Sequence, residues 1–185
     1  MDNFSIKKND YLVEISKFML IHGISSCSLK KMAEAAATSD RMLMHYFKDK
    51  DEIVRLALTR ISQDMFQLLD HGPKHGFAFE EFVPFLIQSI KNTQYKPYFD
   101  IWFELVHLAS NGKEPYRAIS EEIGKTYWHW ILSSSKPGPN EDKERMASLL
   151  FAFIEGCVLL CKMGMHDKVD VATDVLLKFY QTSKQ

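Results

Sequence analysis

The sequence contains no apolar run long enough to cross a bilayer. None of its 185 residues belongs to a stretch of about eighteen apolar residues. The chain also does not open with a charged segment followed by an apolar one, as a secretory leader does. We therefore expect no membrane contact, no signal peptide and a cytoplasmic protein.

Cysteine is scarce, with three residues in the chain. An odd number argues against a disulfide framework. Cys157 and Cys161 lie one helical turn apart, a spacing that suits a metal, but no third or fourth ligand is spaced to match. We expect buried apolar cysteines and no metal site.

The features of an enzyme are missing as well. There is no glycine-rich phosphate loop, no cluster of metal ligands and no nucleophile in a recognisable setting. Glu104 and His107 are residue types that could form an acid/base pair. Residues three apart on a polar helix stripe more often form a solvated pair. We expect no catalytic residues and no cofactor.

An excess of positive charge is absent too. The formal net charge is −1. Residues 1–50 hold 8 Lys and Arg against 6 Asp and Glu, and the remainder holds 15 against 18. Such a weak field predicts that any nucleic-acid binding leans on geometry and neutral donors as well as on cations.

The chain is predicted to be all-α, because no segment shows the sustained alternation of a strand. A loose arm at Met1–Ile6 precedes about nine helices, and His71–Gly76 is the clearest break between two domains. We expect a three-helix head at 1–50 and a second helical domain at 51–185, joined by a long helix over about 50–70. The predicted helices are 7–22, 29–36, 40–46, 50–70, 78–92, 98–110, 116–132, 141–163 and 169–182.

Two of these helices form a helix-turn-helix pattern between Ser28 and Phe47. Ser28 and Ser39 each stand where an N-cap belongs. Leu43 and Phe47, four apart, face inward. That arrangement leaves an outward face made by Asp40, Arg41, Met42, His45 and Tyr46.

The segment 8–58 resembles the DNA-binding domain of the TetR family of bacterial repressors. The matching positions are Gly23, Ser28, Met32, Ala33, Ala36, Ser39, Leu43, Tyr46, Phe47 and Lys50. Two positions depart from the family pattern. Ala37 replaces a glycine, at a cost of roughly 1 kcal/mol in a left-handed turn, so we expect a somewhat different turn. Met44 replaces a tyrosine and removes one hydrogen-bond donor to phosphate.

The resemblance implies that the head at 1–50 is a DNA-binding domain and that residues 51–185 form a ligand-binding and dimerisation domain. Base edges would be contacted by Asp40, Arg41, Met42 and His45, and phosphates by Ser28, Tyr46 and Lys50. Arg41 has the two donors that guanine O6 and N7 accept, and Met42 can pack on a thymine methyl. Alternatives stay open: Asp40 could cap its own helix or pair with Arg41, and Arg41 could be a solvated surface charge.

The last two predicted helices carry more apolar residues than one side of a small bundle needs. Their second face is expected to be covered by a second copy of the chain, as the resemblance implies; the alternative is packing within one monomer. A twofold dimer would place two heads on a near-palindromic operator in double-stranded DNA. The predicted interface residues are Phe153, Gly156, Cys157, Leu160, Val171, Val175, Leu176 and Phe179.

The resemblance further implies a repressor released from DNA when a small molecule enters the second domain. Carboxylates among aromatic side chains favour a hydrophobic or cationic effector, although aromatic residues at helical spacing are often ordinary core. The alternative is a TetR-like protein controlled by a protein partner, with no small-molecule pocket. The predicted pocket residues are Phe99, Trp102, Phe103, Glu104, Val106, Tyr127, Trp128, Trp130, Phe151 and Glu155.

Overall fold

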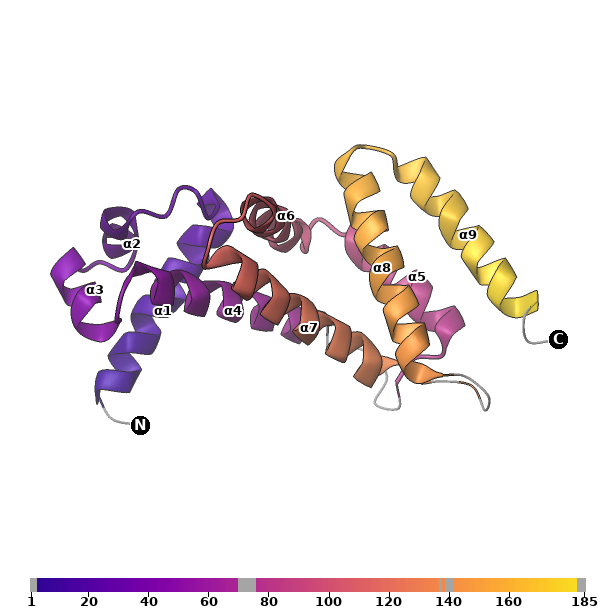
Figure 1. The fold of residues 1–185 in the computed structure, drawn as a ribbon, viewed down its shortest axis with the longest axis horizontal. Coiled ribbons are helices and arrows are strands. Elements are labelled where there is room, and N and C mark those ends of the chain that lie inside the picture. Colours follow the sequence, from indigo (N-terminus) through magenta and orange to yellow (C-terminus); the bar gives the residue numbers. More distant parts are fainter. Residues whose placement is uncertain (1–2, 70–75, 137, 139–141, 183–185) are drawn as a thin grey trace. The chain divides into compact units, whose positions relative to one another are not determined.

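The computed structural model describes residues 3–69, 76–136, 138 and 142–182. Over these residues the regular structure consists of nine α-helices and one isolated bridge between Phe77 and Ser135, so the all-α prediction is confirmed (Figure 1). None of these helices is both long and apolar enough to span a membrane. The helices are α1 (Asn3–His22), α2 (Leu29–Ala35), α3 (Asp40–Tyr46), α4 (Lys50–Leu69), α5 (Phe79–Lys91), α6 (Lys96–Ser110), α7 (Tyr116–Ser134), α8 (Lys143–Lys162) and α9 (His166–Thr182).

The first helix begins earlier than the sequence analysis expected. The loose arm predicted at Met1–Ile6 is wrong from Asn3 onward, where α1 begins. The cause is an apolar contact, because the Phe4 ring stacks on Tyr46 of α3 with centroids 4.6 Å apart. The break predicted at His71–Gly76 falls outside the described residues except for Gly76.

The chain divides into two compact units. Unit 1 comprises residues 1–68 and 97–123, and unit 2 comprises residues 69–96 and 124–185. Helix α6, which falls within the predicted second domain at 51–185, therefore lies from Pro97 onward in unit 1 with the helix-turn-helix. The functional division into 1–50 and 51–185 stays a prediction.

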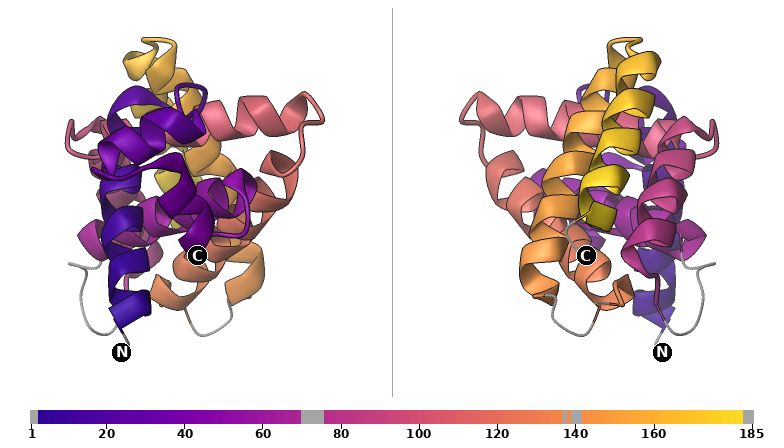
Figure 2. Two further views of the ribbon diagram at one scale, coloured as in Figure 1. Left: turned by 90° about the vertical axis from the view of Figure 1, so that its left-hand side faces the viewer. Right: turned by 90° about the vertical axis from the view of Figure 1, so that its right-hand side faces the viewer.

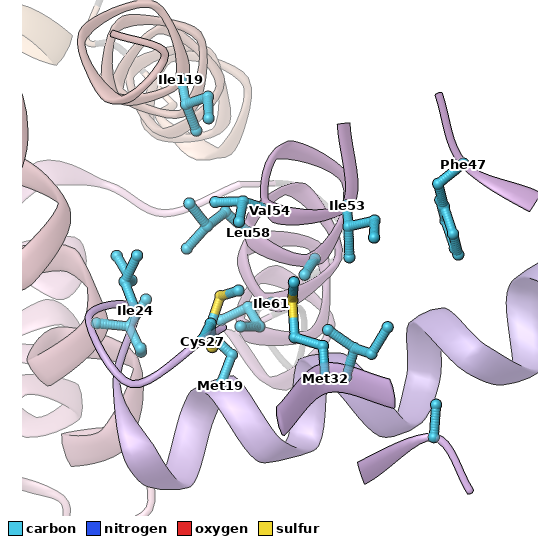
Figure 3. Close-up of a cluster of buried hydrophobic side chains, with 14 of the residues drawn as sticks. Met19, Ile24, Cys27, Met32, Phe47, Ile53, Val54, Leu58, Ile61 and Ile119 are labelled. Carbon is cyan, nitrogen blue, oxygen red and sulfur yellow. The ribbon is translucent and has the colours of Figure 1, made fainter. Parts of the chain in front are cut away.

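Unit 1 has a continuous hydrophobic core. Met19, Ile24, Cys27 and Met32 pack around α4, which contributes Ile53, Val54, Leu58 and Ile61 (Figure 3). From α6 the core receives Ile101, Leu105 and Leu108, and from α7 it receives Ile119. The apolar side of α1 faces this core, since Tyr11, Ile15 and Met19 are buried and Leu12 and Phe18 pack against the cluster.

Unit 2 is built around α8. Helices α8 and α9 run side by side in opposite directions, and α5 packs against both of them (Figures 1 and 2). Rings of the α5 region stack on one another, with Phe77 4.9 Å from Phe82 and 4.7 Å from Phe85. The Phe79 ring lies 4.1 Å from Tyr180 of α9, which fastens the C-terminal helix to α5.

Candidate nucleic-acid interface

Both short helices of the head begin at the predicted serine caps. The Ser28 hydroxyl accepts a hydrogen bond from the Lys31 backbone N–H at 3.2 Å, and Ser39 accepts one from Met42 at 3.2 Å. Each cap satisfies a backbone donor that a seven-residue helix would otherwise leave to water. The boundaries of α2 and α3 therefore follow from local sequence.

The turn between α2 and α3 keeps the left-handed shape that glycine would favour. Ala37 has φ of +49°, and the expectation that the turn differs somewhat from the family's stays a prediction. The Ala37 N–H donates to the Glu34 carbonyl at 3.1 Å and the Thr38 N–H to the Ala33 carbonyl at 2.9 Å. These two bonds close the end of α2 and offset the roughly 1 kcal/mol cost of the alanine.

Helix α3 has the buried and exposed sides that the sequence analysis predicted, except at Tyr46, which was predicted to face outward but is half-buried against the core. Leu43 is fully buried and Phe47 is 2% exposed. The four candidate base-contact residues are all exposed and lie on this helix: Asp40, Arg41, Met42 and His45. Met44, also exposed, adds apolar surface beside them.

An aromatic cluster that the sequence analysis missed supports this helix. The Tyr46 ring packs between Phe4, 4.6 Å away, and Tyr11, 5.3 Å away, while His45 lies edge-on to Phe4 at 5.8 Å. Tyr46 is a candidate phosphate contact, and these contacts fix its ring. The available signal was spacing, because Phe4 precedes Tyr11 by seven residues on the apolar side of α1.

The start of α4 is occupied by acidic side chains. Glu52 accepts a hydrogen bond from the Lys48 N–H at 2.5 Å and pairs with Lys8 at 3.0 Å. The backbone hydrogen bond first, and then Lys8, lower the pKa of the Glu52 carboxyl. The Glu52 N–H donates to the Asp49 carboxylate at 2.8 Å, so the start of α4 is capped, and Lys50, a candidate phosphate contact, is exposed.

The predicted ligand-pocket residues fall into both units. Phe99, Trp102, Phe103, Glu104 and Val106 lie on α6 in unit 1, and Val106 is exposed. Both carboxylate oxygens of Glu104 accept backbone hydrogen bonds, from Ile24 and Ser25. Its carboxylate is therefore bound to the turn after α1, within unit 1.

Four of the other predicted pocket residues cluster in unit 2. The Tyr127 ring stacks parallel to Trp130 at 5.9 Å and meets Phe151 edge-on at 5.7 Å. Burial, and then the charge of Glu155, raise the pKa of the Tyr127 hydroxyl. Trp128 stands apart and donates to Ser148 at 3.1 Å.

Two hollows lie in unit 2, and the first of them shares Trp130 with this cluster. A surface depression of about 680 Å³ is lined by His129, Trp130, Leu132, Ser133, Lys143 and Glu144. A gap of about 10 Å³ lies beneath Phe77, Phe79 and Phe82, which is room for one water at most. No group of three or more metal-ligating side chains gathers among the described residues.

The predicted dimer residues are mostly accessible on α8 and α9. Val171, Val175 and Phe179 of α9 are 60%, 43% and 72% exposed. On α8, Phe153 and Leu160 are half-buried, as is Leu176 on α9, and Gly156 is exposed with open space beside its Cα. Cys157 is 2% exposed because it packs inside unit 2, so it contributes nothing to an outer surface. Leu149, Leu159 and Met163, which the prediction omitted, are exposed.

Comparison with solved structures relates this arrangement to known proteins. No family model matches the sequence, and no curated protein matches it. A TetR-family transcriptional regulator from Cytophaga hutchinsonii is similar at a TM-score of 0.72 and 13% identity, over 96% of this chain and 94% of that one. A transcriptional regulator from Rhodococcus sp. Rha1 is similar at a TM-score of 0.67 and 15% identity, over 93% and 94%. GusR of Salmonella enterica is similar at 0.65 and 17% identity, over 99% and 97%. The chain therefore has the fold of the TetR family of transcriptional regulators.

Proposed function

We propose that this protein is a DNA-binding transcriptional regulator that acts as a homodimeric repressor. The observation that carries the proposal is the arrangement of α3. Its two large apolar residues, Leu43 and Phe47, are buried in the head, while Arg41, Met42 and His45 are exposed together on the outer side. A short capped helix with such a surface suits the major groove, where Arg41 can bind guanine and Met42 a thymine methyl.

Neutral groups and a few cations would hold the phosphates. The Ser28 hydroxyl uses a lone pair for the α2 cap and keeps its proton for a phosphate oxygen. Tyr46, fixed by Phe4 and Tyr11, offers a second hydroxyl, and Lys50 a charge. Because these residues include one cation, the salt dependence of binding should be modest for a protein of this kind.

A second copy of the chain is the proposed cover for the outer face of α8 and α9. Exposed apolar side chains recur on both helices, and a contiguous apolar surface of this kind marks an interaction site. A Cβ at Gly156 would meet no atom within 4 Å, so the space beside this glycine is open. A partner helix could approach the backbone closely there. A twofold interface on this face would give one dimer two recognition helices.

We propose that a small molecule binds unit 2 and releases the operator. Tyr127, Trp130 and Phe151 present ring faces and edges close to the charge of Glu155, a combination that favours a hydrophobic or cationic ligand. A protein partner is the second candidate controller. The gap of about 10 Å³ beneath Phe77, Phe79 and Phe82 favours a protein partner, whereas the depression of about 680 Å³ beside Trp130 favours a small molecule.

The test is a footprint on the DNA immediately upstream of the protein's own gene, at several salt concentrations. We expect a protected near-palindrome whose occupancy falls as salt rises. Absence of protection at low salt would contradict the proposed operator binding. The same footprint then serves to screen hydrophobic cations for release of the DNA.

A further inference from the structure

Glu104 of α6 binds the turn that joins α1 to α2. Its Oε2 accepts a hydrogen bond from the Ile24 backbone N–H at 2.7 Å, and its Oε1 accepts one from Ser25 at 2.7 Å. Both bonds lie within unit 1. Hydrogen bonds that involve an ionised group are short and roughly twice as strong as neutral ones, so this contact is a strong link between segments about 80 residues apart.

The turn is shaped around that carboxylate. Gly23 ends α1 by donating its N–H to the Met19 carbonyl at 2.8 Å, and it has φ of +83°. A Cβ at Gly23 would lie 2.6 Å from Glu104 Oε2, which is closer than such atoms approach. The backbone conformation favours glycine here, and a Cβ would displace the Glu104 carboxylate from its position.

The turn leads directly into the DNA-facing part of the head. Ile24 and Cys27 anchor it in the core, at 2% exposure each, and the Cys27 thiol donates to the Gly23 carbonyl at 3.3 Å. Ser28, the cap of α2 and a candidate phosphate contact, follows Ser25 by three residues. The Glu104 carboxylate therefore holds the turn that leads into α2, whose first residue is set by the Ser28 cap.

We infer that Glu104 is a positioning residue through which α6 holds the α1–α2 turn, and with it Ser28, in the arrangement that binds DNA. This inference rests on the proposed DNA binding. It gives α6 a direct connection to the head in addition to the long helix α4. A displacement of α6 away from the turn by about 1 Å would stretch both bonds beyond hydrogen-bonding distance. A movement of α6 would therefore release the α1–α2 turn.

Glu104→Gln tests the inference because it keeps the size of the side chain. The amide offers one acceptor and turns an NH₂ group toward a backbone donor. We expect operator affinity to fall on the order of fivefold or more, and the Ile24 and Ser25 amides to exchange faster with solvent in the free protein. Loss of a negative charge alone would instead raise operator affinity, because it reduces repulsion from the DNA phosphates.

Glu34→Gln is the matched control. Glu34 lies exposed on α2 of the same head, so its replacement removes the same charge and should leave operator binding unchanged or tighter. Ile119→Val controls for stability, because Ile119 is buried in the unit 1 core and this change lowers the melting temperature without touching the turn. Its operator affinity should match that of the wild type.

Gly23→Ala and Gly112→Ala supply an independent pair. Both glycines have positive φ, but a Cβ at Gly112 meets nothing within 4 Å, so only Gly23→Ala should weaken operator binding. If the wild type binds the operator and Glu104→Gln binds it with the same affinity, the inference is overturned and the proposed function stands. A wild-type protein that binds no operator would overturn the proposed function and this inference with it.

Discussion

Replacing Ser28 with aspartate separates the two roles proposed for its hydroxyl. The cap needs an acceptor for the Lys31 N–H, now bonded at 3.2 Å, and aspartate is as good an N-cap as serine. Its charge also favours a helix N-terminus. The phosphate contact needs a donor, which a carboxylate lacks. We therefore expect an unchanged or higher melting temperature together with weaker operator binding.

The magnitude follows from the one bond that is lost. A hydrogen bond to a charged group contributes about 1.5–3 kcal/mol, which corresponds to roughly 10- to 150-fold in affinity for each head. Fluorescence anisotropy with the footprinted operator measures this change, and thermal unfolding followed by circular dichroism checks the cap.

Ser39→Asp is the control for this experiment. Ser39 caps α3 with the same 3.2 Å bond, so its replacement adds the same charge to the same head without removing a predicted phosphate donor. Equal operator affinities for the two aspartate variants would refute the role of Ser28. Ser28→Thr, which keeps both acceptor and donor, should bind like the wild type.

Three further predictions concern other parts of the molecule. Arg41→Ala should relax the preference at one operator base by about 1–3 kcal/mol, and an unchanged preference in a panel of substituted operators would exclude Arg41 from base readout. Phe179→Asp, at a residue 72% exposed, should convert a dimer to a 21.5 kDa chain in light scattering, whereas Gln181→Asp on the same helix should not. Burial, and then Glu104, raise the pKa of Cys27 from 9.0 to about 11. Its alkylation at pH 8 should therefore be about a hundredfold slower than that of an ordinary thiol. Because the unfolded thiol ionises first, stability should fall as the pH rises from 9.0 to about 11.

Local sequence was enough to predict the helix-turn-helix. Ser28 and Ser39 stand immediately before the helices that they cap, and a cap depends on residues within one turn of it. The spacing of Leu43 and Phe47 predicted their burial for the same reason, since helical periodicity decides which side chains share a face.

Contacts between distant segments were not predictable in this way. Phe4 was assigned to a loose arm because nothing adjacent to it in sequence orders it; its partner Tyr46 lies on α3. Glu104 was expected beside a ligand because a carboxylate among apolar neighbours needs a partner. Glu104 does have hydrogen-bond partners, but they are two backbone N–H groups about 80 residues earlier. Almost every residue has a backbone N–H, so residue type does not show which one a carboxylate binds.

The two turns of the head show why glycine is retained at one and replaced at the other. Ala37 and Gly23 both have positive φ, of +49° and +83°. At Ala37 the penalty is conformational, roughly 1 kcal/mol, and two backbone hydrogen bonds around the turn offset it. At Gly23 a side chain would also lie 2.6 Å from the Glu104 carboxylate, so alanine would disturb the link to α6 as well as the backbone. Gly23 therefore lies where the carboxylate of a distant helix, α6, contacts the end of α1.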